Sequence, residues 1–258
     1  MFFQNCYDIL SKYGSSLLLG VRTTLIVSLI GTAFGLVLGL LVGGLRAVRL
    51  DITSSSAARF FKKIFDVIAN IYILVFRGTP MMVQAVFIYY ALLNVIHWDS
   101  MGAAIFVISI NTGAYMAEII RSGIQAVDAG QTEAVRSLGM SNAQTMMGVV
   151  LPQAVRNAFP AIGNELIVNI KDSSVLMIIS ITELMFQAKS IAGSTFHFTE
   201  TYFIEAMIYL LLTSIASILL NIIEKKMNHS SSLTLPMSDT DPANVDLIQR
   251  KGAERKGE

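Results

Sequence analysis

The stretch Glu133–Pro152, EAVRSLGMSNAQTMMGVVLP, reads as a soluble helix-turn-helix set between strongly apolar segments. Residues 131–136 favour helix, and Gly139 can adopt the positive φ that ends a helix and reverses the chain. Ser141 and Asn142 then offer an N-cap for a second helix. The stretch therefore predicts two short helices joined by a tight turn.

Small residues and a proline shape this stretch further. Pro152 lacks an amide donor, so we expect it to kink or end the second helix. Ala134 and Gly139 leave room for the surface of another protein, so the stretch predicts a docking element. The alternative is an ordinary polar loop between two membrane spans.

The same stretch closely resembles the EAA loop of type I ABC importer permeases. In that pattern Glu-Ala-Ala, three residues and Gly are followed by nine residues, a branched aliphatic, one residue and Leu-Pro. The matching positions are Glu133, Ala134, Gly139, Val149, Leu151 and Pro152. Val135 replaces the second alanine, which adds two methyl groups to the contact surface. The resemblance implies that Glu133, Ala134 and Gly139 dock on a separate ATPase, while Leu151 and Pro152 fix the angle of the loop.

The composition predicts an integral membrane protein. Of the 258 residues, 53% are hydrophobic and only 14% are charged, and the mean hydropathy is +0.61. These values are too apolar for a soluble domain of this length. Four charge-free runs approach the ~20 residues that span a bilayer core. They are Thr23–Leu45, Gly78–Ile96, Met101–Ala117 and Ala206–Ile223.

A fifth span, Leu166–Ala188, is apolar overall but carries three charged residues, Lys171, Asp172 and Glu183. Charges facing lipid are costly, so we expect this helix to face a protein interior or a water-filled path. The first predicted span carries Gly31, Gly35, Gly39 and Gly43 on one face, a stripe that suits close helix packing. The alternative is that glycine is simply common in membrane helices.

Basic residues predict how the chain crosses the membrane. They gather in the first and third connections and after the last span, at Arg46, Arg49, Arg59, Lys62, Lys63, Arg121, Arg136, Arg156, Lys225 and Lys226. Positive charge marks the cytoplasmic side, so five spans place the N-terminus outside and the C-terminus in the cytoplasm. Lys12 and Arg22 on the outer side are a minor conflict. We expect an external segment at residues 1–16, a transmembrane domain at 17–228 with its coupling loop at about 125–160, and a disordered cytoplasmic tail at 229–258.

Two further features concern the second span. Residues 57–76 form an amphipathic pattern with Arg59, Lys62, Lys63 and Asp66, which indicates a helix along the inner membrane surface. Arg77-Gly78-Thr79-Pro80 is expected to break this helix, because Pro80 disfavours an α conformation at Thr79.

Three more segments resemble the polar amino-acid branch of these permeases, whose members include histidine, glutamine and arginine permeases. They are YILVFRGTPMMVQAVFIYYAL at 72–92, NTGAYMAEIIRSGIQAV at 111–127 and FPAIGNELIVNIKDSSVLMII at 159–179. The likeness extends from about Gly20 to Lys226. In the second segment, Glu118 and Arg121 are spaced to pair on one helix face, which we interpret as structural.

The resemblance implies an all-α membrane permease subunit of an ATP-driven amino-acid importer in the bacterial cytoplasmic membrane. Its implied partners are a dimer of ABC ATPase subunits, a second permease subunit, an extracytoplasmic amino-acid-binding protein and membrane lipid. The glycine stripe would serve a second subunit whether it is the same chain or a related one. Polar or adaptable residues are the candidates for the substrate path, namely Met81, Gln84, Asn111, Tyr115, Asn164, Asn169 and Asp172.

Several kinds of chemistry are not expected of this chain. It has no GxxxxGK[ST] loop, so we expect no cofactor here, with ATP and Mg bound by the partner ATPase. HExxH and GxSxG are absent, the histidines at 97, 197 and 229 are far apart in sequence, and Cys6 is a single cysteine. The basic residues are explained by membrane topology, so no nucleic-acid partner is expected.

Two rival hypotheses are a stand-alone secondary transporter or channel and an intramembrane enzyme. The first would need an inverted internal repeat, which we do not see in the sequence. Neither the transported amino acid nor the identity of the second subunit follows from the sequence.

Overall fold

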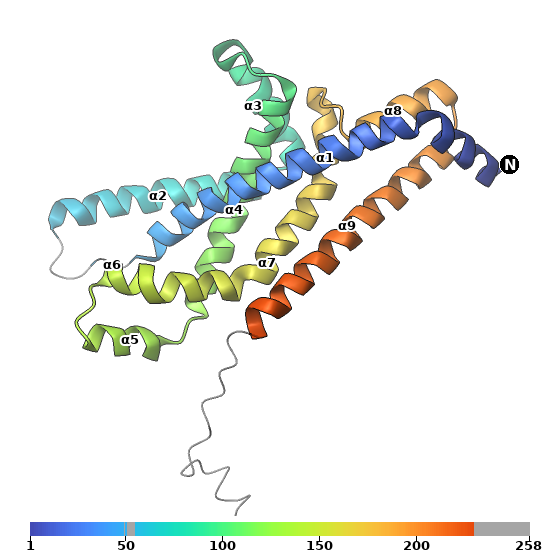
Figure 1. Cartoon of the computed structure of the whole chain (residues 1–258). Coiled ribbons are helices and arrows are strands. Elements are labelled where there is room, and N and C mark those ends of the chain that lie inside the picture. The colour runs from blue at the N-terminus through green and yellow to red at the C-terminus, as the bar shows by residue number, and fades with distance from the viewer. Residues whose placement is uncertain (49, 51–54, 230–258) are drawn as a thin grey trace, which may run out of the picture. The chain divides into compact units, whose positions relative to one another are not determined.

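A computed structural model describes residues 1–48, 50 and 55–229, and within these ranges the chain is helical without strands (Figure 1). The α-helices are α1 (Phe2–Ala47), α2 (Ser56–Gly78), α3 (Met81–Ile96), α4 (Ser100–Gln125), α5 (Ala129–Ser137), α6 (Asn142–Thr145), α7 (Leu151–Asp172), α8 (Leu184–Thr195) and α9 (Phe198–His229). A π-helical turn, η1 (Met146–Val150), joins α6 to α7, and a 3₁₀ helix, η2 (Ser173–Ile179), follows α7. Residues up to Asn221 form one compact unit, and a second unit begins at Ile222.

Three helices in the described ranges are long and apolar enough to cross a membrane alone, namely α1, α4 and the Phe198–Met227 part of α9. Two bent pairs add up to two more spans. The α2 and α3 helices meet at 115°, and the Asn142–Ile179 stretch meets α8 at 58°. The predicted five-span arrangement therefore stays a prediction, as do the sides on which the two ends lie. The predicted tail at 229–258 lies outside the described residues except for His229.

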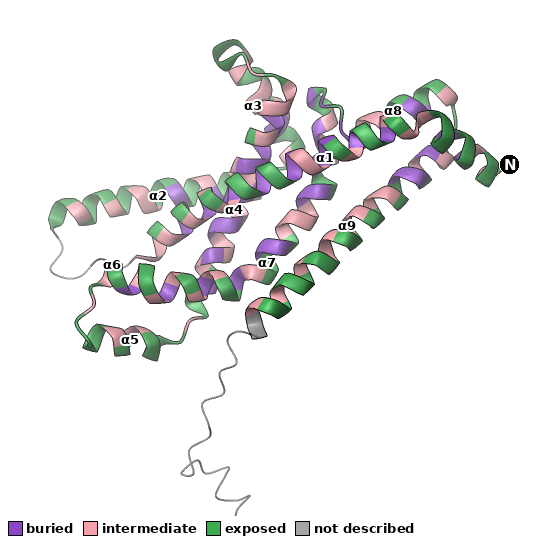
Figure 2. Ribbon diagram, viewed as in Figure 1, coloured by how far each residue is buried: buried purple, intermediate pink, exposed green. Residues whose placement is uncertain are grey.

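The core forms mainly where α1 packs along α4, as the buried residues in Figure 2 show. A Cβ added at Gly35 would lie 2.7 Å from Cβ of Thr112, and one at Gly43 would lie 2.6 Å from the Ala117 carbonyl oxygen. Gly31 and Gly39 meet Ile108 and Met116 in the same way. The prediction that the stripe packs closely against a helix is confirmed. The idea that it serves a second subunit is wrong, because α4 of the same chain already occupies it.

The beginning of α1 is part of the folded unit. Helix starts at Phe2, so residues 1–16 continue directly into the first span. Cys6, Ile9 and Leu17 are buried in a cluster with Leu184 of α8 and Ile204 of α9. The predicted external segment is thus helical and packed, while its position outside the membrane stays a prediction.

The predicted break at Arg77-Gly78-Thr79-Pro80 is confirmed. Helix α2 ends at Gly78, Thr79 is extended with φ −124° and ψ 148°, and α3 begins at Met81. Pro80 imposes this extended conformation on the residue before it. Two side chains, described below, satisfy the carbonyl groups that the break leaves open.

Candidate functional site

The loop between α4 and α7 has the turn that the sequence predicts. Gly139 has φ +88°, a left-handed conformation that residues with a Cβ rarely adopt. Ser141 caps α6 through a capping box, in which its hydroxyl accepts from Gln144 N and the Gln144 side chain accepts from Ser141 N. Local residue chemistry therefore sets the angle between α5 and α6.

Pro152 does not end the second helix, contrary to one of the two outcomes expected for it. It lies in the first turn of α7, which continues to Asp172. The π-helical turn η1 precedes it, and Leu151 N–H bonds to the Met146 carbonyl five residues back. Pro152 has no amide N–H to donate, and the wider π-helical turn allows the helix to continue past it.

The two short helices present an exposed face. No residue of α5 is buried, and Glu133, Ala134 and Gly139 are all exposed. Leu138 at the tip is 84% exposed. Leu151 lies differently, because it is half-buried and packs on the cluster that contains Met116 and Ile120. The loop is therefore anchored through Leu151 and free at its α5 end.

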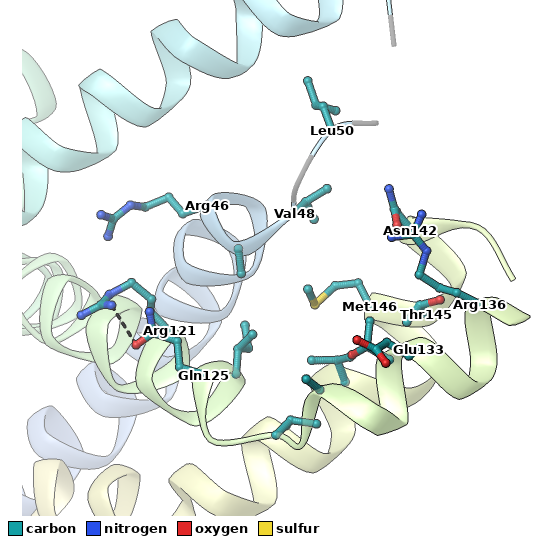
Figure 3. A pocket seen from close by; sticks show the side chains of 16 residues that line it. Arg46, Val48, Leu50, Arg121, Gln125, Glu133, Arg136, Asn142, Thr145 and Met146 are labelled. Atoms are coloured by element: carbon teal, nitrogen blue, oxygen red, sulfur yellow. Dashed lines mark hydrogen bonds between the residues drawn. The ribbon is translucent and has the colours of Figure 1, made fainter. Parts of the chain in front are cut away.

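A cavity of about 770 Å³ separates this loop from the ends of α1 and α4 (Figure 3). Arg46, Arg121, Glu133 and Arg136 contribute charged side chains to its lining. Thr145 also lines it, and its buried hydroxyl has no hydrogen-bond partner among the described residues. The loop thus meets the helix ends across a hollow lined by both charged and apolar side chains, and not across a packed core.

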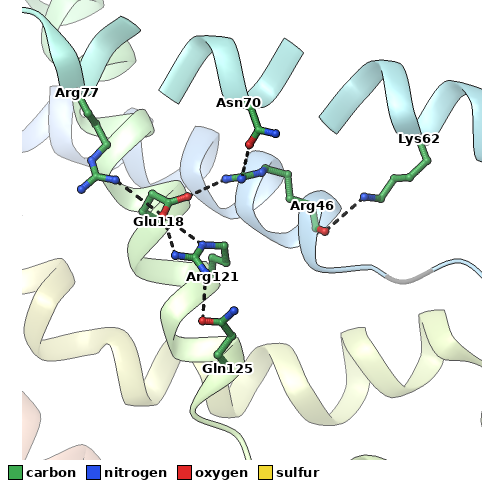
Figure 4. Close-up of polar contacts among 7 residues, drawn as sticks. All are labelled: Arg46, Lys62, Asn70, Arg77, Glu118, Arg121 and Gln125. Atoms are coloured by element: carbon green, nitrogen blue, oxygen red, sulfur yellow. Dashed lines mark hydrogen bonds and ion pairs between the residues drawn. The ribbon is translucent and has the colours of Figure 1, made fainter. Parts of the chain in front are cut away.

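Glu118 lies at the centre of an ionic network above this cavity (Figure 4). Its carboxylate is 2.8 Å from Arg46 Nη1, 2.8 Å from Arg121 Nη2 and 3.8 Å from Arg77 Nη1. The predicted pairing with Arg121 is confirmed. Arg46 and Arg77 come from α1 and α2, and no local pattern in the sequence indicates that they join the same carboxylate. Arg46 also donates to Asn70 of α2, so the network links three helices.

Gln84 and Asn111, two candidates for the substrate path, satisfy the backbone at the α2–α3 break. Gln84 Nε2 donates to the carbonyl oxygens of Phe76 and Thr79, each at 2.9 Å. Asn111 Nδ2 donates to Gln84 Oε1 at 2.8 Å. The break would otherwise leave carbonyl groups without partners inside a membrane protein.

Asn169, another path candidate, is 3% exposed and lies between α1, α4 and α7. Its Nδ2 donates to Thr32 Oγ1 at 2.7 Å and to Thr112 Oγ1 at 2.9 Å. Its side-chain oxygen Oδ1 accepts from Thr112 Oγ1 at 3.2 Å, and its backbone carbonyl oxygen accepts from Ser28 Oγ at 3.0 Å. The side chain is therefore fully engaged within the protein.

The other path candidates divide between the core and an accessible face. Met81 packs on the core beside Val107 and Leu176. Tyr115 is half-buried, and the Arg77 guanidinium lies 5.2 Å from its ring centroid. Asn164 and Asp172 are exposed on α7.

Glu165, which was not among the predicted site residues, interacts electrostatically with Asp172 and with Arg77. Its seven-residue spacing from Asp172 places both carboxylates on one face of α7, a signal that the sequence already contained.

The three charges of the predicted fifth span have different surroundings. Glu183 is completely buried and accepts from Met185 N at 2.8 Å, Phe186 N at 2.7 Å and the Tyr209 hydroxyl at 3.1 Å. For this residue, the expected protein interior is confirmed. Lys171 and Asp172 are exposed in the isolated chain. In the described part of the chain, no group of three or more His, Cys, Asp or Glu residues is arranged to hold a metal ion.

Comparison with known proteins gives consistent matches over most of the chain. Residues 52–229 match the family described as "Binding-protein-dependent transport system inner membrane component". The glutamine transport system permease protein GlnP of Escherichia coli (strain K12) is 37% identical over 211 residues, which cover 81% of this chain and 91% of that protein. The probable amino-acid ABC transporter permease protein YckA of Bacillus subtilis (strain 168) is 36% identical over 211 residues, covering 81% and 88%.

Solved structures give the same result at the level of the fold. A crystal structure of an amino acid ABC transporter with histidines is 38% identical, with a TM-score of 0.73 over 84% of this chain and 96% of that chain. An inward-facing structure of the MetNI methionine ABC transporter has a TM-score of 0.71 over 83% of this chain and 97% of that chain. At 20% identity, this second structure supports the fold alone.

Proposed function

The chain belongs to the family of binding-protein-dependent transport system inner membrane components, and we propose that its α5–α6 loop couples amino-acid import to a separate ATPase. Relatives that are 36–38% identical include amino-acid permeases and a solved amino-acid ABC transporter. The chain is accordingly the permease subunit of an ABC amino-acid importer, a multi-pass protein of the bacterial inner membrane.

The exposed α5–α6 loop is the observation that carries the coupling proposal. Glu133, Ala134 and Gly139 form its outer part, and Leu138 offers an apolar contact for a partner. Leu151 joins the loop to the core. A force applied at α5 would pass through the Gly139 turn to α6, which continues through η1 into α7 without a break. ATP-driven movement of a docked ATPase would thereby shift the spans between two states.

The remaining partners and the orientation follow from this scheme. A second permease subunit completes the path, a binding protein delivers the amino acid outside, and the ATPase subunits bind ATP and Mg. The basic connections then face the cytoplasm, with five spans, an outer N-terminus and a cytoplasmic tail. The boundaries at 17–228 for the transmembrane domain and 125–160 for the loop complete the proposed organisation.

For the substrate path, we propose the accessible face formed by Tyr115, Asn164 and Asp172, together with Arg77 and Glu165. An amino acid carries both an ammonium and a carboxylate group, and this face offers carboxylates and a guanidinium for them. The helices that form the path are held in position by contacts of the remaining candidates, namely Met81, Gln84, Asn111 and Asn169. In uptake assays, Asp172→Asn should raise KM for the amino acid while ATP hydrolysis without substrate stays unchanged.

The coupling proposal is tested by ATP hydrolysis in vesicles that contain this chain with its ATPase and binding protein. Polar amino acids are added one at a time. One of them should stimulate hydrolysis, and Glu133→Lys should remove both the stimulation and the uptake. Uptake by the purified chain down a gradient without any ATPase would instead identify a secondary transporter.

A further inference from the structure

A second hollow lies between the end of α1 and the first turns of α2, and its lining is strongly basic. It has a volume of about 490 Å³, and its charged residues among those that the structure describes are Arg46, Arg59, Lys62, Lys63 and Asp66. Asp66 is engaged with Lys62 at 2.6 Å, and Arg46 with Glu118 at 2.8 Å. Arg59 and Lys63 are exposed and make no ion pair with any residue of the described ranges. Within the described part of the chain, these two positive charges of the hollow thus have no counter-charge.

The position of these charges is unfavourable for α2 itself. Arg59 precedes Lys62 by three residues and Lys63 by four, so like charges are neighbours on one face of the helix. Arg59 also lies in the first turn of α2, where the helix dipole is positive, and this turn contains no acidic residue. An anion at this face would remove both penalties. The arrangement therefore fits an anionic ligand better than it fits the stability of the helix.

The face of α2 next to the basic one is apolar and uncovered. Phe60 is 62% exposed, Val67 is 50% exposed and Ile68 is 60% exposed. By helical spacing, Val67 and Phe60 lie beside Lys63 around the helix. A phospholipid combines an anionic headgroup with acyl chains, so one molecule can contact both faces. A soluble anion would leave the apolar face uncovered.

We propose that this hollow binds the headgroup of an anionic phospholipid, with Arg59 and Lys63 as its main contacts. The acyl chains lie along the apolar face of α2. Arg46 lines both this hollow and the cavity over the α5–α6 loop, so the bound lipid is a neighbour of the proposed coupling element. The lipid site itself does not depend on the coupling proposal.

The test measures lipid binding to the full chain purified in a non-ionic detergent. Phosphatidylglycerol or phosphatidylcholine is titrated in, and bound lipid is counted by native mass spectrometry alongside the thermal unfolding midpoint. Phosphatidylglycerol should remain bound and raise the midpoint, whereas phosphatidylcholine should do neither. In the double variant Arg59→Gln/Lys63→Gln, affinity for phosphatidylglycerol should fall roughly 30-fold, since each basic residue near an anionic lipid contributes roughly a five- to sixfold factor.

The control variant is Lys225→Gln/Lys226→Gln, which removes the same charge from exposed positions on α9 and should keep the wild-type affinity. High salt should abolish the preference for phosphatidylglycerol in the wild type. Equal retention of the two lipids, or unchanged affinity in the Arg59/Lys63 variant, would overturn the proposal. Stabilisation by inorganic phosphate alone would also overturn it, because the site would then bind a soluble anion.

Discussion

At the scale of single residues, Asn169 illustrates how one amide can hold three helices together. Its side chain bonds to Thr32 of α1 and Thr112 of α4, and its backbone carbonyl oxygen accepts from Ser28 of α1. From the sequence, Asn169 was grouped with Asn164 as a candidate for the substrate path. The two residues have the same chemistry but opposite burial, which depends on helix contacts that no local pattern contains. A role for either in transport stays a prediction.

The first prediction concerns the stability that Asn169 provides. Asn169→Leu removes the bonds to Thr32 and Thr112 and leaves both hydroxyl groups buried without this partner. Interhelical hydrogen bonds in membrane proteins contribute about 0.6 kcal/mol on average and up to ~1.7, so we expect a loss of roughly 1–3 kcal/mol. Unfolding in a denaturing detergent, followed by the fluorescence of the single tryptophan, Trp98, measures this loss.

Asn164→Leu is the matched control for this change. It alters the same side chain on the same helix at an exposed position, so the free energy of unfolding should stay close to that of the wild type. If both variants lose the same stability, the bonds of Asn169 do not hold the helices together.

At the scale of helices, patterns of small and turn-forming residues predicted more than the positions of polar side chains did. The break before Pro80, the positive φ of Gly139 and the cap at Ser141 all depend on local backbone preferences, and all three are confirmed. The π-helical turn before Pro152 was not predicted, because a proline at this position is compatible with a kink, a helix end or a widened turn. The helix that packs on the glycine stripe could not be predicted either. A stripe of glycines indicates close helix packing but does not identify the helix that packs against it.

The second prediction tests the contact between α1 and α4. A Cβ at Gly39 would collide with Met116 and with the backbone of Ala117, so Gly39→Ala must push the helices apart. Overpacking of this kind costs about 1–3 kcal/mol. The same unfolding assay should therefore show a clear loss of stability.

Gly44→Ala serves as its control on the same helix. In the part of the chain that the structure describes, no atom of a neighbouring element lies within 4 Å of a Cβ built at Gly44. Replacing a helical glycine by alanine gains about 0.5–1 kcal/mol through reduced backbone entropy, so this variant should be as stable as the wild type or slightly more so. Equal losses in the two variants would mean that backbone flexibility, and not the α4 contact, requires glycine in this stripe.

At the scale of the whole molecule, the Glu118 network joins helices that the sequence treats as separate spans. Arg46, Arg77 and Arg121 come from α1, α2 and α4 and share one carboxylate. The all-helical fold and its apolar helices were predictable from composition. The ion pairs between these charges were not predictable from the sequence, because they require the ends of three helices to lie close together in space.

The third prediction follows from this shared carboxylate. Glu118→Gln keeps the shape of the side chain but leaves three guanidinium groups without their counter-charge. Because the network is partly exposed, we expect a loss of about 1–2 kcal/mol in the free energy of unfolding. Arg77→Gln removes the longest contact, 3.8 Å, from the most exposed arginine of the three and should cost less than half as much. The reverse order of the two losses would show that Arg77, and not Glu118, stabilises this end of the molecule.

The fourth prediction concerns coupling across the molecule. Gly139 has no neighbour within 4 Å of a built Cβ but requires φ +88°, so a substitution there changes the turn and the docking face without disturbing the core. Gly139→Trp strains the turn and places a large ring on the face proposed for the ATPase. Gly139→Asn is the matched variant, because asparagine tolerates the left-handed region and adds a small side chain.

In vesicles with the ATPase and binding protein, the Trp variant should abolish uptake and substrate-stimulated ATP hydrolysis, whereas the Asn variant should retain most of both. Since both variants leave the membrane helices intact, each should insert and unfold like the wild type, and normal uptake by the Trp variant would remove the loop from the coupling mechanism.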